Sequence, residues 1–145
     1  MKKIFTAIVM LISTHSVHAQ FHIEVAPLSA SARNVISYAP AVGISHSWEF
    51  VHTQVLYQWN VNYSHTGYAF VGPRMYGERD VRHVILLGGA YSTFSSQAVK
   101  TGEKLPEGWS LALGYRAEFE KVALQVDVTK AHATVRFQFT LLNNK

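Results

Sequence analysis

The sequence contains no cysteine, which excludes both a disulfide framework and a thiolate metal site. It also carries little net charge, because Lys2 and Lys3 account for two of the formal +4 and the other basic residues are scattered. We therefore do not expect a nucleic-acid partner. Beyond residue 19 the chain has no apolar run of the roughly 20 residues that a membrane-spanning helix needs. A closed barrel of strands is then the one structure with which this chain could cross a bilayer.

The first 19 residues have the pattern of a cleaved signal peptide. Lys2-Lys3 gives a positive start, Ile4 to Ile12 forms an apolar core, and Val17-His18-Ala19 places small residues at a cleavage site before Gln20. The alternative, a membrane anchor, needs a longer apolar core. We expect residues 1–19 to be removed after export and residues 20–145 to form one domain.

Hydrophobic and polar residues alternate through most of the remaining chain, which is the two-residue period of β-strands. Regular alternation covers Thr53–Ser64, broken only by Leu56, and Trp109–Phe119, Val122–Thr129 and Ala133–Leu141. Weaker strands are expected at Phe21–Pro27, Tyr38–Ser47, Tyr68–Tyr76 and Arg82–Thr93. Turn signals lie between them at Ser29–Asn34, Glu49–His52, His65–Gly67, Gly77–Asp80, Phe94–Gly108, Glu120–Lys121 and Lys130–His132. The sequence therefore predicts an all-β fold, an eight-stranded antiparallel up-and-down barrel.

The composition of the two faces favours a membrane barrel over a soluble one, although both alternate. A soluble barrel would show lysine on its wet face, yet beyond the signal peptide every lysine lies in a connection, at a strand start or at the terminus. The polar face instead carries small and amide residues that suit a narrow lumen. Aromatic residues on the apolar face are expected to form interfacial girdles; they are Tyr57, Trp59, Tyr63, Tyr68, Trp109, Tyr115 and Phe119. A soluble, exported ligand-binding barrel remains the alternative.

The lengths of the connections also favour a membrane barrel. If the N-terminus lies in the periplasm, the longest connection, Phe94–Gly108, faces the outside, while Glu120–Lys121 is a tight periplasmic turn. Lys100, Glu103, Lys104 and Glu107 make the long connection a charged surface and a candidate recognition loop. Ser29–Asn34 is a second, shorter candidate. The competing interpretation is that the loop only covers the barrel mouth.

Several segments together resemble the small outer-membrane barrels of the outer membrane protein X and attachment-invasion group. The resembling segments are 67–76 (GYAFVGPRMY), 86–91 (LLGGAY), 111–115 (LALGY), 121–126 (KVALQV) and 135–139 (VRFQF). The resemblance implies a polar, plugged interior and external loops that serve adhesion or contact with host factors. The chain departs from the family pattern in its short Lys130–His132 connection and in its Asn143-Asn144-Lys145 ending.

Charged residues on the polar face are expected to meet inside the barrel. They are Glu24, Arg116, Glu118, Asp127 and Arg136, with Arg74 and Glu49 as additional candidates. Folding the last strands about their turns brings Asp127 beside Arg136 and Arg116 beside Gln125. Buried charges must be paired and hydrogen-bonded, and eight strands leave an interior just wide enough for side chains. We therefore expect a structural plug, with an ion or proton path as the alternative.

The sequence offers little support for catalysis or for a bound cofactor. A lipid A-modifying barrel enzyme, which is the enzymatic alternative, needs a serine nucleophile beside a histidine base. Ser45-His46-Ser47 and Ser64-His65 come nearest, but neighbouring residues on a strand point to opposite faces, and Ser64-His65 lacks a nearby acid. The histidines show no metal-ligand spacing. We expect a non-enzymatic protein without cofactor or metal.

The expected role is that of a bacterial outer-membrane scaffold with structural or adhesive function. Its expected partners are outer-membrane lipid and, at the long loop, an extracellular ligand or host surface, and the chain is expected to be a monomer.

Overall fold

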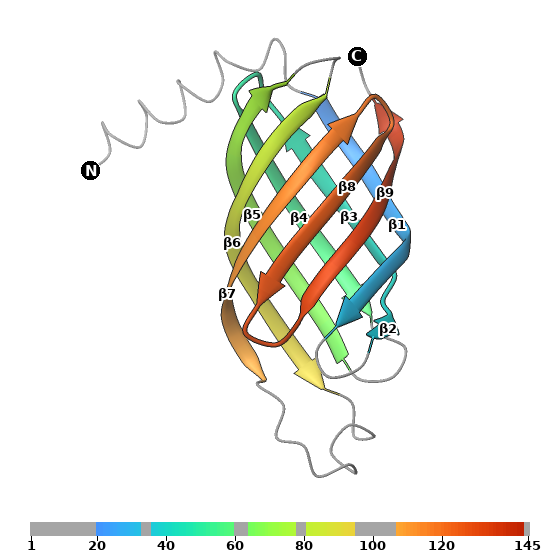
Figure 1. Ribbon diagram of the computed structural model, residues 1–145, viewed down its shortest axis with the longest axis vertical. Helices are drawn as coiled ribbons and strands as arrows, with labels where there is room; N and C mark the ends of the chain where they lie inside the picture. Colours follow the sequence, from blue (N-terminus) through green and yellow to red (C-terminus); the bar gives the residue numbers. More distant parts are fainter. Residues whose placement is uncertain (1–19, 33–35, 60–63, 78–80, 95–106, 144–145) are drawn as a thin grey trace, which may run out of the picture.

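The computed structural model describes residues 20–32, 36–59, 64–77, 81–94 and 107–143 (Figure 1). These residues form the strands β1 (Gln20–Ala32), β2 (Ile36–Tyr38), β3 (Ala41–Ser47), β4 (Val51–Trp59), β5 (Ser64–Tyr76), β6 (Arg82–Phe94), β7 (Gly108–Phe119), β8 (Val122–Thr129) and β9 (Ala133–Asn143). All join one antiparallel sheet in the order β2-β1-β3-β4-β5-β6-β7-β8-β9, and pairing of β1 with β9 closes it. No helix in the described part of the chain is long and apolar enough to cross a membrane.

The nine strands make an eight-stranded barrel, because β2 and β3 are successive parts of one barrel strand. Both pair with β1, β2 opposite Ala30–Ala32 and β3 opposite Gln20–Ala26. Ala39 and Pro40 separate them, and the Ala39 N–H donates to the Ser29 carbonyl oxygen at 3.0 Å. Proline supplies no donor for the ladder, which accounts for the break. The predicted fold class is confirmed, and the single strand expected at Tyr38–Ser47 is divided in two.

Several strands extend further than the sequence pattern indicates. The turn expected at His65–Gly67 is wrong, since these residues lie in β5 and pair with both β4 and β6. Likewise Ser29–Ala32, expected in a loop, belongs to β1 and pairs with β2 and β9. Strand tilt and stagger explain this, because a closed barrel needs strands that reach past their neighbours' ends. The rest of that predicted loop, Arg33 and Asn34, lies outside the described residues.

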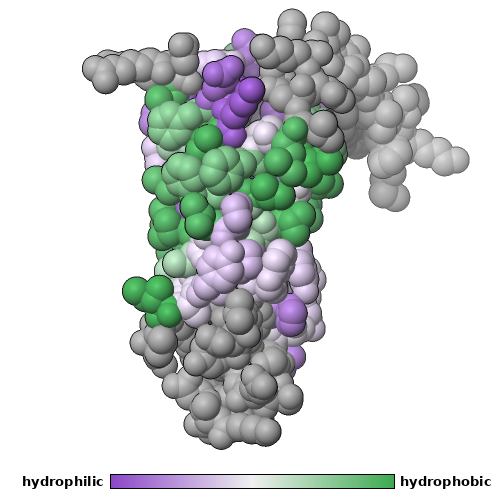
Figure 2. All heavy atoms as spheres, turned by 90° about the vertical axis from the view of Figure 1, so that its right-hand side faces the viewer, coloured by the Kyte–Doolittle hydropathy of each residue, from purple (hydrophilic) through white to green (hydrophobic). Residues whose placement is uncertain are grey.

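Side chains alternate between a buried, largely polar lumen and an exposed apolar outer surface. Large hydrophobic side chains point outward along every barrel strand, and in the described chain both lysines, Lys121 and Lys130, lie in connections. On the face that Figure 2 displays, apolar residues form a continuous area across the barrel wall, with hydrophilic residues above it at the end where β1 begins and β9 ends. This is the reverse of a soluble barrel, whose apolar face points inward.

One irregularity in β1 changes which residues face inward. The register against β9 shifts between Val25 and Leu28, so that Ala26 and Ser29 are both buried while Pro27 and Leu28 are exposed. A bulge of this kind bends the strand and increases its twist. It lets one continuous strand keep polar residues inside along both of its halves.

The lumen has a polar and an apolar wall. The apolar wall comes from β4 to β7 and consists of Leu56, Tyr68, Phe70, Val84, Leu86, Ala90 and Ala112. Leu56, the one irregular residue of its predicted strand, is buried in this cluster. Neighbouring strands approach closely here, since a Cβ at Gly88 would overlap the carbonyl oxygen of Ala69.

Candidate functional site: the charged network of the lumen

Two carboxylates and two arginines form a chain of ion pairs at the end of the lumen that lies near the termini. Arg116 on β7 donates from Nη2 to Glu24 Oε1 of β1 at 2.5 Å and from Nη1 to Glu24 Oε2 at 3.2 Å. Its Nε donates to Glu118 Oε1 at 2.9 Å, and Arg74 Nε donates to Glu118 Oε2 at 3.0 Å. Ser45 and Gln54 also donate to Glu24, at 2.8 and 2.7 Å. Both oxygens of the Glu24 carboxylate therefore accept hydrogen bonds from protein groups, and Glu24 is only 1% exposed to solvent.

A second ion pair lies nearer the other end. Arg136 on β9 pairs with Asp127 on β8, and both side chains are completely buried. Arg136 also donates to Gln58 Oε1 from Nε at 3.0 Å and from Nη2 at 2.6 Å. Its guanidinium carbon lies 4.5 Å from the centroid of the Tyr68 ring, which adds a cation–π contact.

Two glutamines connect the two ion-paired groups into one network. Arg116 donates to Gln138 Oε1, Gln138 Nε2 donates to Gln125 Oε1 at 3.1 Å, and Gln125 Nε2 donates to Asp127 Oδ1 at 3.2 Å. The buried acids and arginines balance in number, with Glu24, Glu118 and Asp127 against Arg74, Arg116 and Arg136. These six groups therefore give the lumen no net charge.

All five residues predicted for the lumen network lie in it. Arg116 pairs in register with Gln125, and Asp127 contacts Arg136 diagonally across β8 and β9. Arg74 joins the network, whereas Glu49 does not: it is exposed in the connection between β3 and β4. That candidate was wrong because the strand before it ends at Ser47.

Sequence reasoning did not identify the contacts of the lumen glutamines, two of which, Gln58 and Gln138, accept hydrogen bonds from Arg136 and Arg116. Gln54, Gln58, Gln125 and Gln138 all stand on the polar face of regular strands and are 0 to 2% exposed. The alternation marks them as lumen residues, but their contacts depend on which strands meet across the lumen. Gln58 and Arg136, for instance, are 78 residues apart.

Aromatic side chains on the outer surface gather toward both ends. Tyr57, Trp59, Trp109, Tyr115 and Phe119 are exposed as expected, whereas Tyr68 is buried in the lumen. The placement of Tyr68 on the outer face was wrong because in this part of β5 the larger residues, Tyr68 and Phe70, face inward. Tyr63 lies outside the described residues. Tyr91, which is also exposed, lies directly opposite Trp109 on the neighbouring strand, and the centroids of the two rings are 5.3 Å apart.

One buried group has the composition of a catalytic triad but not its geometry. Ser47 Oγ lies 2.8 Å and Glu118 Oε1 3.3 Å from the same atom, Nδ1 of His52. A working triad places serine and acid on opposite ring nitrogens, and here Nε2 of His52 has no partner in the described chain. This group therefore differs from a working triad in its geometry.

Ser45 and His46, one of the serine–histidine pairs picked out from the sequence, are also separated. Ser45 points into the lumen and donates to Glu24, whereas His46 stacks edge-on against Trp48 with centroids 4.1 Å apart. His65 Nδ1 shares a 2.7 Å hydrogen bond with the Tyr57 hydroxyl. Among the described residues, no group of three or more His, Asp or Glu side chains could hold a metal ion.

Of the candidate recognition loop, only Glu107 belongs to the described residues. It is exposed just before β7, which begins at the end of the barrel opposite the last residues of β9 (Figure 1). Lys100, Glu103 and Lys104 lie outside the described residues.

Comparison with known proteins defines the class by fold. Neither a family model nor a curated protein matches this chain. A structure from work on the de novo design of transmembrane β-barrels is similar, with a TM-score of 0.51 and 12% identity over 85% of this chain and 94% of the designed one. The protein thus has the fold of a transmembrane β-barrel. No family match supports the finer resemblance to the outer membrane protein X and attachment-invasion group.

Proposed function

We propose that this chain is exported by its signal peptide and acts as a monomeric outer-membrane barrel that presents external connections on a closed scaffold. In this role it neither conducts solutes nor catalyses a reaction. The observation that carries the proposal is the lumen network, in which Glu24, Glu118 and Asp127 are matched by three arginines.

The network is suited to a plug rather than to a path for ions. A conducting lumen needs water-accessible charge, whereas the Arg116 and Arg136 guanidiniums are committed to carboxylates and amides. Eight strands enclose only enough space for side chains, and Leu56, Tyr68 and Phe70 fill the opposite wall. An ion could pass only if several buried ion pairs broke, and each break would leave a buried charge without its partner, which is strongly unfavourable.

The outer surface supports the membrane location. Exposed side chains such as Val55, Leu87 and Val135 form an apolar surface that water would not favour. Interfacial aromatic residues flank such a band in known outer-membrane barrels. Here Trp109 is 80% exposed near one end and Phe119 is 51% exposed near the other.

Adhesion or another surface interaction would be carried by the connections opposite the termini. The sequence of the longest, residues 95–107, includes Lys100, Glu103, Lys104 and Glu107. An extracellular ligand or host surface with both charge signs would complement it.

Fractionation combined with bilayer recording tests the proposal. Full-length protein expressed in a bacterium with two membranes is expected in the outer membrane, and boiling should shift its gel mobility. Purified barrel in planar bilayers should show no discrete conductance steps, with a known porin as positive control. Folded protein recovered without detergent would overturn the membrane location, and stepwise conductance would overturn the plug.

A further inference from the structure

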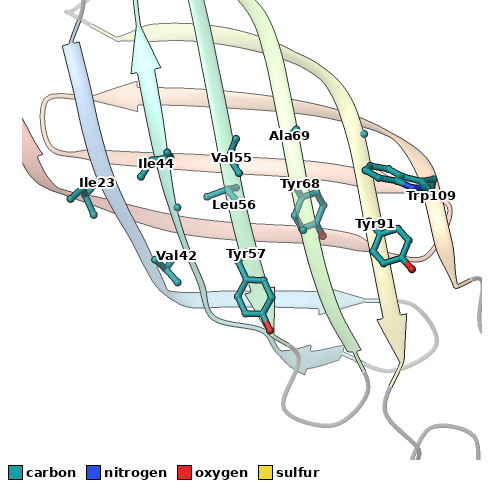
Figure 3. A pocket seen from close by; sticks show the side chains of 13 residues that line it. Ile23, Val42, Ile44, Val55, Leu56, Tyr57, Tyr68, Ala69, Tyr91 and Trp109 are labelled. Atoms are coloured by element: carbon teal, nitrogen blue, oxygen red, sulfur yellow. The ribbon is translucent and has the colours of Figure 1, made fainter.

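The outer surface has a groove where neighbouring strands carry unusually small residues. Gly67 and Ala69 on β5 and Gly89 on β6 form its floor. Tyr57 rises on one side, and Tyr91 and Trp109 rise on the other (Figure 3). The groove is the deepened part of a broader hollow that continues past Tyr57 to Val42 and Ile23, and the whole hollow has a volume of about 530 Å³. It is a hollow in an outer surface on which many large apolar side chains are exposed.

Strand register explains the shape of the groove. Tyr57, Gly67, Tyr91 and Trp109 are direct neighbours across β4 to β7. In the next row, Ala69 and Gly89 lie between Val55 and Leu111. The two tyrosines are therefore two strand spacings apart, about 9.6 Å, with only a glycine between them. This is a slot for one narrow chain.

The packing of the barrel does not require glycine at these positions. A Cβ added at Gly67 would meet nothing within 4 Å, and one at Gly89 would find its nearest neighbour, the Trp109 ring, at 3.8 Å. In the lumen the reverse holds, because a Cβ at Gly72 would overlap the carbonyl oxygen of Ile85. The lumen glycine permits close strand packing, while the outer glycines only keep the slot open.

One end of the groove is polar. A second hollow of about 400 Å³ continues from Gly67 past Tyr57 and Tyr91 to His65 and Thr93. The Tyr57 hydroxyl is hydrogen-bonded to His65 Nδ1 at 2.7 Å, and the two rings stack with centroids 5.9 Å apart. In Figure 3 the hydroxyls of Tyr57 and Tyr91 both point toward the end of the barrel that bears the long connection. The groove thus runs from an apolar middle to a polar rim.

We propose that this groove binds one acyl chain of a bilayer lipid, whose headgroup lies against the Tyr57–His65 pair. The inference rests on the proposed membrane location, where the groove opens within the apolar band. An acyl chain has the width and polarity of the slot, and the polar rim stands where a headgroup begins. A second barrel is a poorer fit, because its convex wall would not enter a slot between two rings.

Native mass spectrometry of the full chain in detergent tests the proposal, with dipalmitoyl phosphatidylglycerol as the added probe. We expect one retained lipid per barrel. Gly67→Leu and Gly89→Leu fill the slot without a backbone clash and should lower the retained fraction about tenfold, which corresponds to the loss of roughly ten close carbon–carbon contacts. Ala133→Leu, on the outer face of β9, adds a side chain outside the groove and should leave retention unchanged.

The possible outcomes separate this inference from the proposed function. A heat-dependent gel shift first shows that each variant is folded. Equal lipid retention in Gly67→Leu and the native chain would overturn the lipid site, as would a native dimer that Gly67→Leu dissociates. Folded protein that stays in solution without detergent would instead overturn the membrane location itself.

Discussion

Arg116 and Glu24 form a two-pronged ion pair across the lumen, between strands that are 92 residues apart in sequence. Both side chains are nearly inaccessible to solvent, at 4% and 1%. The pair connects β7 to β1, which are not neighbours in the sheet. This side-chain ion pair therefore links two strands across the interior of the barrel, in addition to the backbone hydrogen bonds between neighbouring strands.

Removing one partner of this pair should destabilise the barrel strongly. Glu24→Gln leaves the Arg116 charge with only Glu118, and the loss of one partner of a buried pair costs about 3–5 kcal/mol. Urea unfolding in lipid vesicles, followed by gel mobility, measures this change in the free energy of unfolding. Glu120→Gln, in the exposed turn between β7 and β8, should change it by less than about 0.5 kcal/mol.

A double variant separates the ion pair from the fold. Glu24→Gln combined with Arg116→Gln removes both charges, so its cost should be smaller than the sum of the two single costs. Strictly additive costs would mean that the two residues do not stabilise each other.

Two glycines of the barrel should respond in opposite ways to the same methyl group. Gly88→Ala places a Cβ against the Ala69 carbonyl oxygen and should cost about 1–3 kcal/mol or more, as overpacking does. Gly67→Ala meets nothing within 4 Å and should be neutral or slightly stabilising. The same urea assay compares them, and equal effects would argue against the close strand approach at Gly88.

Arginine on the outer surface should reveal the depth of each position in the bilayer. Val126→Arg, in the middle of β8, should cost about 2–4 kcal/mol in vesicles, while Leu141→Arg near the end of β9 should cost about 0–1 kcal/mol. Both positions are exposed in the barrel. If the apolar band did not face lipid, both arginines would be tolerated equally.

Overexpression should leave the mass of lipid A unchanged. Ser47 and Glu118 share one nitrogen of His52, so the serine has no base that is itself oriented by an acid. Mass spectrometry of extracted lipid A measures this. A new lipid A species that disappears in Ser47→Ala would show that the site rearranges into a catalyst.

The sequence pattern predicts best where inner and outer residues differ most. Trp109–Phe119, Val122–Thr129 and Ala133–Leu141 match β7, β8 and β9 to within a few residues, because large apolar residues face outward and polar ones inward. In β5 the contrast fails: Tyr68 and Phe70 face the lumen while Gly67 and Ala69 face outward. Hydropathy cannot assign faces when part of the lumen is itself apolar.

The partners of the lumen residues are harder to predict than their direction. Alternation places Gln58 and Arg136 inside, but their hydrogen bond depends on the cross-section of the closed barrel. The bulge between Val25 and Leu28 also reverses the inside–outside order partway along β1. A local pattern cannot show such a shift, because it depends on the strand that pairs alongside.

Closure between β1 and β9 also sets the cooperativity of folding. Glu24 comes from the first strand, while Gln138 and Arg136 come from the last, and contacts so distant in sequence form late. Until the last strand is in place, Asp127 lacks Arg136 and the lumen holds a charge without its partner. A barrel that lacks its last strand is therefore destabilised in two ways: it has an edge strand with unpaired backbone groups, and it has a charge in the lumen without its partner. Partly assembled forms should be sparsely populated, which makes assembly close to all-or-none.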